Sequence, residues 1–360
     1  MSYSTIEFGA EAIGAFDQLI DVRSPAEFAD DHMPNAKNLP VLDNVERARI
    51  GTIYKQVSKF EARRQGGALV AANISRHLCC ALADRPPRWR PLIYCWRGGL
   101  RSAAMATVLN QVGWRAGVLQ GGYKTYRRHV IERLHNHSPA FRGISIAGGT
   151  GVAKTEVLKR LAARGVQTLD LEDLAGHRGS LFGALPGVEQ PSQKLFESRL
   201  LAALDRFDLK RPVIVEAESN RIGARQTPPA VWAAMRAAPE IELSAPPSVR
   251  ARYLVSAYSD LIADPQRIET QIARLRPYHS REEIAGWIEY ARTSDHAALA
   301  EALIRSHYDP AYARHRRKAG RASATRIELS DLSARSQEEA ADQIEGLIER
   351  LAGVALEKLD

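Results

Sequence analysis

Short apolar runs that end in turn residues alternate with helical segments along the first 140 residues of the chain. FDQLIDV at 16–22, PLIYC at 91–95 and GVLQGGY at 117–123 read as buried strands that end in loops. SAAMATVLNQVGW at 102–114 has the apolar spacing of an amphipathic helix. Strands that alternate with helices predict a mainly parallel α/β sheet, in which reactive loops lie beyond the carboxyl ends of the strands.

The pattern begins again near residue 140. A strand at 144–147 leads through a glycine-rich loop into a helix from Lys154, and RPVIVEAES at 211–219 reads as another buried strand. From about residue 248 onward the apolar spacing is helical. We therefore predict an α/β fold with three parts: a parallel-sheet domain at 1–138, a second α/β domain at 139–245, and a helical, basic region at 246–360 that packs on the second domain.

The composition of the 360 residues narrows the class of protein. Hydrophobic residues make up 45% of the chain, which is ordinary for a globular core and excludes disordered, collagen-like and coiled-coil sequences. The 50 Lys and Arg residues exceed the 42 Asp and Glu residues, and the net charge of +8 mildly favours a polyanionic partner. The helical segments show no sustained heptads, so we expect a monomer.

Cysteine content and the absence of long apolar runs indicate a compartment. Three cysteines cannot form a disulfide framework, which favours a reducing environment, and we expect the cytoplasm. The N-terminus has no basic start followed by an apolar run, and no stretch of about 18 apolar residues occurs. We therefore expect neither secretion nor a membrane span.

Cys95 directly follows a predicted strand, where a parallel sheet presents its reactive loops. Glycines behind it let backbone N–H groups point into the loop, Ser102 can cap a helix that faces the sulfur, and two arginines add positive charge. Such surroundings stabilise a nucleophilic thiolate. The predicted anion site around this catalytic candidate consists of Trp96, Arg97, Gly98, Gly99, Arg101 and Ser102. The alternative is a buried structural cysteine, which is what we expect for Cys79 and Cys80 on their apolar helix.

Four segments of the first domain resemble the rhodanese family. They are LIDVRSPAEF, DHMPNAKNLP, YCWRGGLRS and LQGGYKTYRR, within a match of roughly residues 5–137. The residues that fall where the family's opening signature places them are Asp21, Arg23, Ser24, Glu27, Phe28, His32, Pro34, Ala36 and Pro40. The resemblance implies a rhodanese-like domain whose cysteine, here Cys95, carries a transferable sulfur or selenium atom.

The spacing within the cysteine loop leaves a second interpretation open. Many rhodanese loops read C-x-x-G-x-R, whereas here six positions lead from Cys95 to Arg101. This is also the C-x5-R-S spacing of cysteine phosphatases, some of which share the fold. Those phosphatases usually have histidine before the cysteine, and this chain has Tyr94.

The loop after residue 147 matches most of the phosphate-binding motif G-x-x-x-x-G-K-[ST] and predicts a P-loop NTPase-like domain. Its N–H groups and lysine would bind phosphate oxygens, and its threonine could hold Mg²⁺. Ala153 stands where glycine is expected, and its methyl group costs roughly 1 kcal/mol or more only if the backbone is left-handed. The alternative is a glycine-rich turn with a solvated lysine. The predicted diphosphate-binding residues are Gly148, Gly149, Thr150, Gly151, Lys154 and Thr155.

Polar residues near this loop could complete a phosphate site. Carboxylates at two predicted strand ends are candidates for acid/base or metal-side roles, or are solvated and capping groups: Asp170, Glu172, Glu216 and Glu218. AGHRGSLFG at 175–183 is either an ordinary loop or an anion-binding loop with His177, Arg178 and Ser180. We predict no tightly bound cofactor, and Mg²⁺ is the candidate metal.

Two basic runs are candidates for contact with a nucleic acid. KTYRRH at 124–129 contains Lys124, Arg127 and Arg128, and the run at 311–327 contains Arg314, Arg316, Arg317 and Lys318 but no acid. Such side chains can follow a phosphate backbone while tyrosines stack on unpaired bases. The alternative is a solvated charged face.

The order of the motifs resembles the tRNA 2-selenouridine synthase family over nearly the whole chain. The segments that carry the resemblance are CWRGGLRS, GGYKTYRRHV, the phosphate loop, LDLEDLAGHRGSLFG, QPSQKLFE and VEAESNRIG. It implies a transferase whose partner is tRNA with 2-thiouridine at the wobble position. The sulfur is geranylated from geranyl diphosphate, and selenium from selenophosphate then replaces the geranylthio group. Cys95 matches the family's catalytic cysteine, while Ala153 and Ala217, in VEAES where VEDES is commoner, depart from the pattern.

We expect the two domains to divide this chemistry. Lys154 and the amides of residues 148–151 would hold the leaving diphosphate, and Cys95 would carry selenium as a perselenide. Trp96 would stack on the flipped base or serve packing alone. Two other functions remain as alternatives: a P-loop kinase or ATPase with a rhodanese binding module, and a plain sulfurtransferase.

Overall fold

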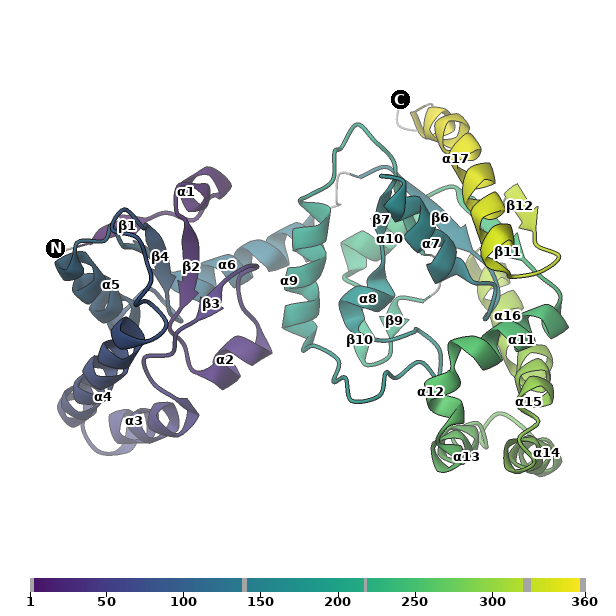
Figure 1. Ribbon diagram of the computed structural model, residues 1–360, viewed down its shortest axis with the longest axis horizontal. Helices are drawn as coiled ribbons and strands as arrows, with labels where there is room; N and C mark the ends of the chain where they lie inside the picture. Colours follow the sequence, from purple (N-terminus) through teal and green to yellow (C-terminus); the bar gives the residue numbers. More distant parts are fainter. Residues whose placement is uncertain (1–2, 138–140, 217–218, 320–324, 357–360) are drawn as a thin grey trace. The chain divides into compact units, whose positions relative to one another are not determined.

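The computed structural model describes residues 3–137, 141–216, 219–319 and 325–356. The chain divides into two compact units, Met1–Asn136 with Pro191–Ala202, and His137–Gln190 with Ala203–Asp360. Each unit contains a five-stranded parallel sheet with helices around it, so the predicted α/β fold class is confirmed (Figure 1). No helix among the described residues is long and apolar enough to cross a membrane.

The sheet of the first unit has the order β1-β5-β4-β2-β3, and every neighbouring pair is parallel. Its core joins Ile20, Ile93 and Val118 of the strands to Val70 of α4 and Leu109 of α5. Because the strands are parallel, the loops after β2, β4 and β5 lie at one edge. The elements are β1 (Ser4–Ile6), α1 (Ala10–Gly14), β2 (Gln18–Asp21), α2 (Pro25–Asp30), β3 (Lys37–Asn38), α3 (Asn44–Gln56), α4 (Lys59–Cys79), β4 (Pro91–Tyr94), α5 (Leu100–Val112), β5 (Gly117–Leu119), α6 (Gly122–Ile131) and a π-helical turn (Glu132–Asn136).

Cys79 and Cys80 lie at the end of α4 and are both exposed, so the prediction that they are core residues is wrong. The buried positions on this helix include Gly66, Val70 and Ile74. A helical stripe with this spacing continues through residues 77–78, and the two cysteines fall beside it. The prediction relied on the apolar composition of the helix. The spacing of its buried positions shows that the two cysteines lie outside the buried face.

The sheet of the second unit has the order β12-β11-β6-β8-β7, again with parallel neighbours. The phosphate loop between β6 and α7 therefore shares one edge with the ends of β7 and β8. The elements of this unit up to β11 are β6 (Gly143–Ala147), α7 (Lys154–Ala163), β7 (Gln167–Leu169), α8 (Leu171–Ala175), β8 (Val213–Glu216), the antiparallel pair β9 (Arg221–Ile222) and β10 (Arg225–Gln226), α10 (Pro229–Ala237) and β11 (Glu240–Ser244). α9 (Gln193–Leu204) precedes β8 along the chain but belongs, up to residue 202, to the first unit.

The region after residue 246 is mostly helical, but the prediction of an entirely helical region is wrong at β12 (Thr325–Glu328). This strand pairs in parallel with β11 and forms an edge of the sheet. Ile327 and Leu329 are buried while Arg326 and Glu328 are exposed, the alternation of a strand with one buried face. The strand is too short to stand out between long helices.

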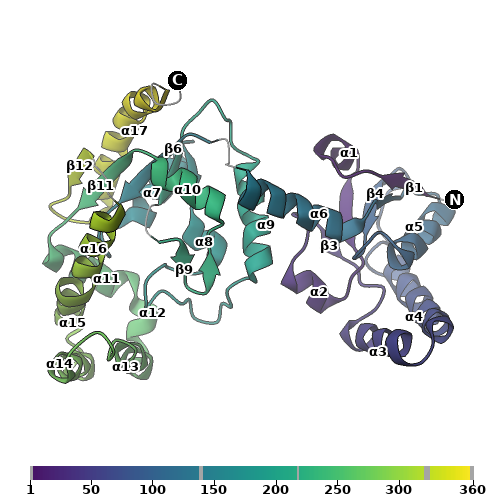
Figure 2. The ribbon, with the colours of Figure 1, turned by 180° about the vertical axis from the view of Figure 1, so that it is seen from behind.

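The remaining helices complete the second unit. α17 packs on α7, where Ala340 and Ile344 share a core with Val157 and Leu161 (Figure 2). A separate apolar cluster holds the shorter helices together around Trp287. The helices are α11 (Pro247–Ala257), α12 (Ser259–Ile262), α13 (Pro265–Ala273), α14 (Arg281–Arg292), α15 (His296–Leu303), a π-helical turn (Ile304–Tyr308), α16 (Asp309–Ala319) and α17 (Ala334–Leu356).

Candidate active site

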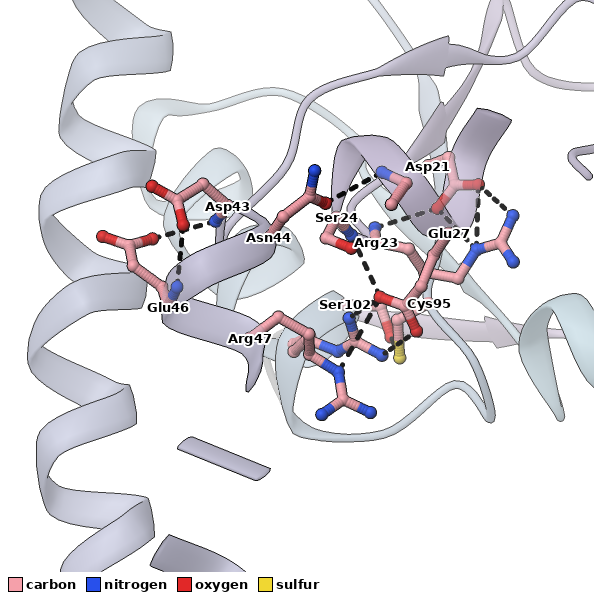
Figure 3. Close-up of polar contacts among 12 residues, drawn as sticks. Asp21, Arg23, Ser24, Glu27, Asp43, Asn44, Glu46, Arg47, Cys95 and Ser102 are labelled. Carbon is pink, nitrogen blue, oxygen red and sulfur yellow. Dashed lines mark hydrogen bonds and ion pairs between the residues drawn. The ribbon is translucent and has the colours of Figure 1, made fainter. Parts of the chain in front are cut away.

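Cys95 lies directly after β4 and is only 3% exposed. Two hydrogen-bond donors reach its Sγ at 3.3 Å, the backbone N–H of Gly99 and the hydroxyl of Ser102. Figure 3 shows Ser102 beside Cys95. The prediction that Ser102 caps α5 is wrong, because Gly99 is the N-cap and Ser102 lies in the first turn of the helix. From that position the Ser102 hydroxyl contacts the sulfur directly.

The surroundings of the Cys95 thiol hold its pKa below the ordinary value. Burial acts in the opposite direction, because a thiolate loses hydration in the protein interior. The hydrogen bonds from Ser102, the positive charge of Arg101 and the backbone N–H of Arg97 outweigh burial. The sulfur is therefore ionised more readily than a free thiol and is suited to nucleophilic chemistry.

The two arginines of the loop act on the sulfur in different ways. Arg101 Nη1 lies 2.8 Å from Glu27 Oε2, and the same carboxylate oxygen accepts a hydrogen bond from the Ser24 backbone at 3.1 Å (Figure 3). Glu27 therefore fixes Arg101 and neutralises part of its charge. The Arg97 side chain is exposed, so its backbone N–H rather than its guanidinium group is what lowers the pKa of Cys95.

The paired glycines after β5 bring the start of α6 against the cysteine loop. Gly122 has a φ of 57°, and a Cβ atom there would lie 2.2 Å from the carbonyl oxygen of Cys95. The close approach lets Tyr123 N–H donate to the Cys95 carbonyl at 2.9 Å and Lys124 N–H donate to the Trp96 carbonyl at 3.0 Å. Glycine is required here because another residue would push the loop away.

A buried polar cluster that sequence reasoning missed lies beneath the loop. Arg23 binds Asp21 at 2.6 Å, and its guanidinium carbon lies 4.0 Å from the centre of the Tyr123 ring. The Tyr123 hydroxyl donates to Asp31 at 2.8 Å. Burial, the largest effect, raises the pKa of Asp31. Asp31 and Tyr123 both lie in segments that resemble the rhodanese family, Asp31 as the first residue of DHMPNAKNLP and Tyr123 directly after the glycine pair of LQGGYKTYRR, but neither was named as a site residue.

Trp96 is 39% exposed and its ring lies 5.2 Å from that of Tyr123. The indole therefore has one supported face and a solvent-accessible part next to the cysteine. A fully buried tryptophan could only serve packing. The partial exposure of Trp96 therefore permits the base-stacking role that the sequence suggests.

The phosphate loop has the backbone conformations that its glycines permit. Gly148 has a φ of 152° and Gly151 a φ of 85°. Ala153 is also left-handed, with φ 61° and ψ 29°, so its methyl group carries a conformational cost of roughly 1 kcal/mol or more. Lys154 begins α7, is 6% exposed, and its Nζ donates to the Gly148 carbonyl at 2.9 Å.

The predicted carboxylates separate into different roles. Thr155 Oγ1 lies 3.5 Å from Glu172 Oε2 and 3.4 Å from Glu216 Oε2, and Glu216 Oε1 lies 3.8 Å from Lys154 Nζ. Asp170 instead caps α8 by accepting the Asp173 N–H at 2.9 Å, which is the capping alternative. Glu218 lies outside the described residues.

The described residues contain no group of three or more His, Cys, Asp or Glu side chains that could hold a metal ion. Glu172, Glu216 and the Thr155 hydroxyl supply only two carboxylates and one neutral oxygen. Mg²⁺ commonly binds through one or two carboxylates together with water and substrate phosphates. These three side chains therefore fit Mg²⁺ that arrives with a phosphorylated substrate.

A pocket of about 520 Å³ opens along the phosphate loop. Its wall includes Lys154, Thr155, Glu172 and Glu216, together with Arg178 and Ser180. Arg178 is held there by Asp260 at 2.9 Å and by the ring of Tyr258 at 4.9 Å. His177, by contrast, does not line the pocket, and its Nδ1 accepts the Gly179 N–H at 3.1 Å. Two of the three residues predicted in the anion loop thus face the phosphate site.

The structure divides each basic run into paired and exposed side chains. Arg127 makes an ion pair with Glu197, and Arg316 lies 2.6 Å from Glu240, so both are held against the protein. The exposed members are Lys124, Arg128, Arg314 and Arg317. The side chain of Lys318 lies outside the described part of the chain.

Comparisons with known proteins agree with this two-domain arrangement. The rhodanese-like domain family matches residues 9–129, and the tRNA 2-selenouridine synthase AAA domain family matches residues 142–285. The tRNA 2-selenouridine synthase of Nitrosomonas europaea is 34% identical over 279 residues, which cover 74% of this chain and 70% of the relative. The enzyme of that name from Alcanivorax borkumensis is 30% identical over 326 residues, covering 82% and 88%.

Other relatives are matched over a smaller part of their length. The tRNA 2-selenouridine synthase of Chromohalobacter salexigens is 36% identical over 247 residues, 68% of this chain and 66% of the relative. Both domain matches and the long alignments lead to one assignment. The chain belongs to the tRNA 2-selenouridine synthase family, a family of tRNA-modifying enzymes.

Proposed function

We propose that this chain converts wobble 2-thiouridine in tRNA to 2-selenouridine by S-geranylation followed by selenium substitution. The observation that carries the proposal is the Cys95 sulfur, which accepts two hydrogen bonds at 3.3 Å and has a lowered pKa. The second support is a phosphate loop with a lined pocket in the same chain. The tRNA substrate and the selenouridine product are taken from the relatives, which are tRNA 2-selenouridine synthases.

Geranylation uses the phosphate loop in this proposal. The sulfur of 2-thiouridine attacks C1 of geranyl diphosphate, a C–S bond forms, the C–O bond breaks, and diphosphate leaves with the electron pair. The N3 proton of the base is released to solvent. Lys154 and the amides of residues 148–151 stabilise the charge that develops on the leaving group, while Arg178 reaches the same pocket.

Alkylation has to precede substitution for a chemical reason. A thiocarbonyl sulfur is a poor leaving group, whereas an S-alkylated C2 is electrophilic and releases its sulfur as a thiolate. Hydrolysis of selenophosphate gives phosphate and selenide. Selenide attacks the Cys95 sulfur of a mixed disulfide with an external thiol, so that the S–Se bond of the perselenide forms, the S–S bond breaks and the thiol leaves with the electron pair. The perselenide then attacks C2, and the C2–S bond breaks as geranyl thiolate leaves. An external thiol breaks the remaining S–Se bond by forming a disulfide with Cys95, which leaves selenium on the base.

Nucleoside mass spectrometry can test the two steps separately. The protein is incubated with a 2-thiouridine anticodon stem-loop, a thiol reductant, and geranyl diphosphate or selenophosphate alone or together. We expect the geranylated nucleoside with the first donor alone and selenouridine with both. Cys95→Ser should stop at the geranylated product, whereas Lys154→Ala should lose geranylation at least 10-fold, as oxyanion-type donors do.

Matched variants separate these effects from general damage. Cys79→Ser removes an exposed thiol and Lys210→Ala an exposed lysine, and both should behave as the parent protein. Selenation by Cys95→Ser would refute the carrier role of the sulfur. Normal geranylation by Lys154→Ala would show that the diphosphate of the donor does not bind at this loop. Rapid ATP hydrolysis without tRNA would favour the alternative function of an ATPase.

A further inference from the structure

A second pocket, which the sequence did not indicate, adjoins the phosphate pocket within the second unit. Its volume is about 80 Å³, and its wall is formed mainly by apolar side chains of α11, α12, α13 and α15. The residues that form its apolar part are Phe182, Leu254, Leu261, Ile268, Leu299 and Leu303. We call this the apolar pocket.

The apolar pocket and the phosphate pocket share one wall. Thr150 of the phosphate loop, Ser180, Leu254 and Tyr258 line both of them. Leu254 lies close to the loop itself, since a Cβ atom on Gly151 would be 2.8 Å from its Cγ. A ligand whose anionic end lies on the loop can therefore extend past Leu254 without crossing bulk solvent.

The linings of the two pockets select for a ligand with two different ends. The phosphate side offers Lys154, Thr155 and Arg178, which suit a multiply charged anion. The other side offers aliphatic and aromatic carbon, which gains free energy by covering hydrocarbon. A nucleotide base carries polar edges that need partners. Ser180, His296 and Tyr308 also line this pocket, but its exposed surface is almost entirely carbon, which leaves most of those edges unsatisfied.

We propose that the apolar pocket holds the hydrocarbon chain of a prenyl diphosphate whose head group lies on the phosphate loop. This inference rests on the proposed function, because it places the chain of the geranyl donor used there. It gives the helices α11, α12, α13 and α15 a role in binding the donor. It also places C1 of the donor, the atom that is attacked, at the shared wall near Thr150 and Ser180.

Two substitutions on α15 test the apolar pocket. Ala300 lines it, so Ala300→Phe fills space that the chain needs. Ala297 lies on the same helix but is exposed, and Ala297→Phe is the matched control. Binding of inorganic diphosphate, dimethylallyl diphosphate and geranyl diphosphate is measured by calorimetry for the parent and both variants, with thermal unfolding as a check of folding.

The parent should bind geranyl diphosphate at least about 10-fold more tightly than inorganic diphosphate, because buried CH₂ groups add affinity. Ala300→Phe should lose about 10-fold for geranyl diphosphate, with little change for dimethylallyl diphosphate and none for inorganic diphosphate. Ala297→Phe should match the parent.

Two failures of this experiment have different meanings. If the parent binds geranyl diphosphate no more tightly than inorganic diphosphate, or if Ala300→Phe binds it as the parent does, the chain does not use the apolar pocket. If the parent binds neither compound, the phosphate loop is not the donor site, and the proposed function fails together with this inference. Should Ala300→Phe unfold, Leu299→Ala, which enlarges the pocket, must instead shift preference toward a fifteen-carbon donor, and unchanged preference overturns the proposal.

Discussion

The lowered pKa of Cys95 comes from small groups close to the sulfur rather than from a large positive patch. Gly99 and Ser102 each donate to Sγ at 3.3 Å, and the one guanidinium group that acts on the sulfur, that of Arg101, is paired with Glu27. Short, directed donors stabilise an anion even where its burial is unfavourable. The reactivity of this thiol should therefore depend strongly on single hydrogen bonds.

Ser102→Ala should raise the pKa of Cys95, because it removes the hydroxyl donor. A hydrogen bond to a charged group contributes about 1.5–3 kcal/mol, equivalent to a rise of about 1–2 pH units. The rate of Cys95 alkylation by iodoacetamide, followed peptide by peptide against pH, gives the midpoint. In the parent the thiolate persists to lower pH than for an ordinary thiol and is lost only as the pH falls through its lowered pKa. Ser75→Ala, at an exposed site on α4, should leave the midpoint in place, and an unshifted midpoint in Ser102→Ala would contradict the assignment.

Ala153→Gly should cost almost no stability, because Ala153 is the N-cap of α7 and not a position in the helix interior, where glycine is costly. The substitution relieves roughly 1–2 kcal/mol of left-handed strain, which offsets the lost methyl contact and the greater freedom of the unfolded chain. Ala162→Gly, at an exposed right-handed position of α7, should lower the free energy of unfolding by about 1 kcal/mol. Urea unfolding compares them, and an equal loss at both positions would show that Ala153 is unstrained.

At this scale the sequence predicts which residues gather but not how each side chain points. The spacing of Cys95, Gly99 and Ser102 after a strand is local, so a motif captures it. The Arg97 side chain points to solvent, and the Asp170 side chain caps α8. Both orientations depend on neighbouring residues that the spacing of a motif does not specify. Asp31 begins the quoted segment DHMPNAKNLP, but its hydrogen bond with Tyr123 was not predicted, because tertiary packing brings the two residues together.

At the scale of elements, α6 joins the cysteine loop to α9. The start of α6 donates to the carbonyls of Cys95 and Trp96, and one turn later Arg127 pairs with Glu197 of α9. Glu197 is 3% exposed, and besides Arg127 it is contacted by His135 Nε2 at 3.2 Å and by Gln193 Nε2 at 3.0 Å. Within the basic run at 124–129, Arg127 thus packs against α9, whereas Lys124 and Arg128 are exposed to solvent.

Arg127→Ala and Arg128→Ala, neighbours on α6, should differ sharply. Removing Arg127 leaves a buried carboxylate without its guanidinium partner and should lower the free energy of unfolding by roughly 3 kcal/mol. Arg128 is exposed, and its removal should change stability by about 0.5 kcal/mol or less. Guanidinium unfolding followed by circular dichroism measures both, and equal losses would contradict the structural role of Arg127.

The prediction of helices and strands succeeded for segments with a clear local pattern and failed for the short strand β12. The phosphate loop, its flanking strand and helix, and the strand that delivers Cys95 all follow from local pattern. β12 has four residues, and its place in the sheet is decided by pairing with β11. No local signal records a parallel partner some eighty residues away.

At the scale of the whole molecule, the excess of 8 positive charges acts through the side chains that stay exposed. Arg314 and Arg317 of α16 are exposed, whereas Arg316 between them is bound to Glu240 and Glu242 of β11. Only the exposed members can exchange counterions with an RNA backbone. The basic composition alone overstated the number of side chains available to tRNA.

Arg314→Ala and Arg317→Ala should each weaken tRNA binding and make it less dependent on salt. Each lost phosphate contact should reduce the slope of log K against log salt by about 0.7–0.9. Filter binding over a salt series measures the slope, and Arg335→Ala on α17, which is paired with Glu339, serves as the exposed control. If both variants have the same slope as the parent protein, the tRNA does not contact Arg314 or Arg317.

The inclusion of residues 191–202 in the first compact unit has a consequence for biosynthesis. On the ribosome, the sheet that carries Cys95 emerges before residues 137–190, and the segment that contributes Glu197 and Lys194 follows them. At a synthesis rate of roughly 5–20 residues per second, several seconds pass before residues 191–202 can pack on the rest of the first unit.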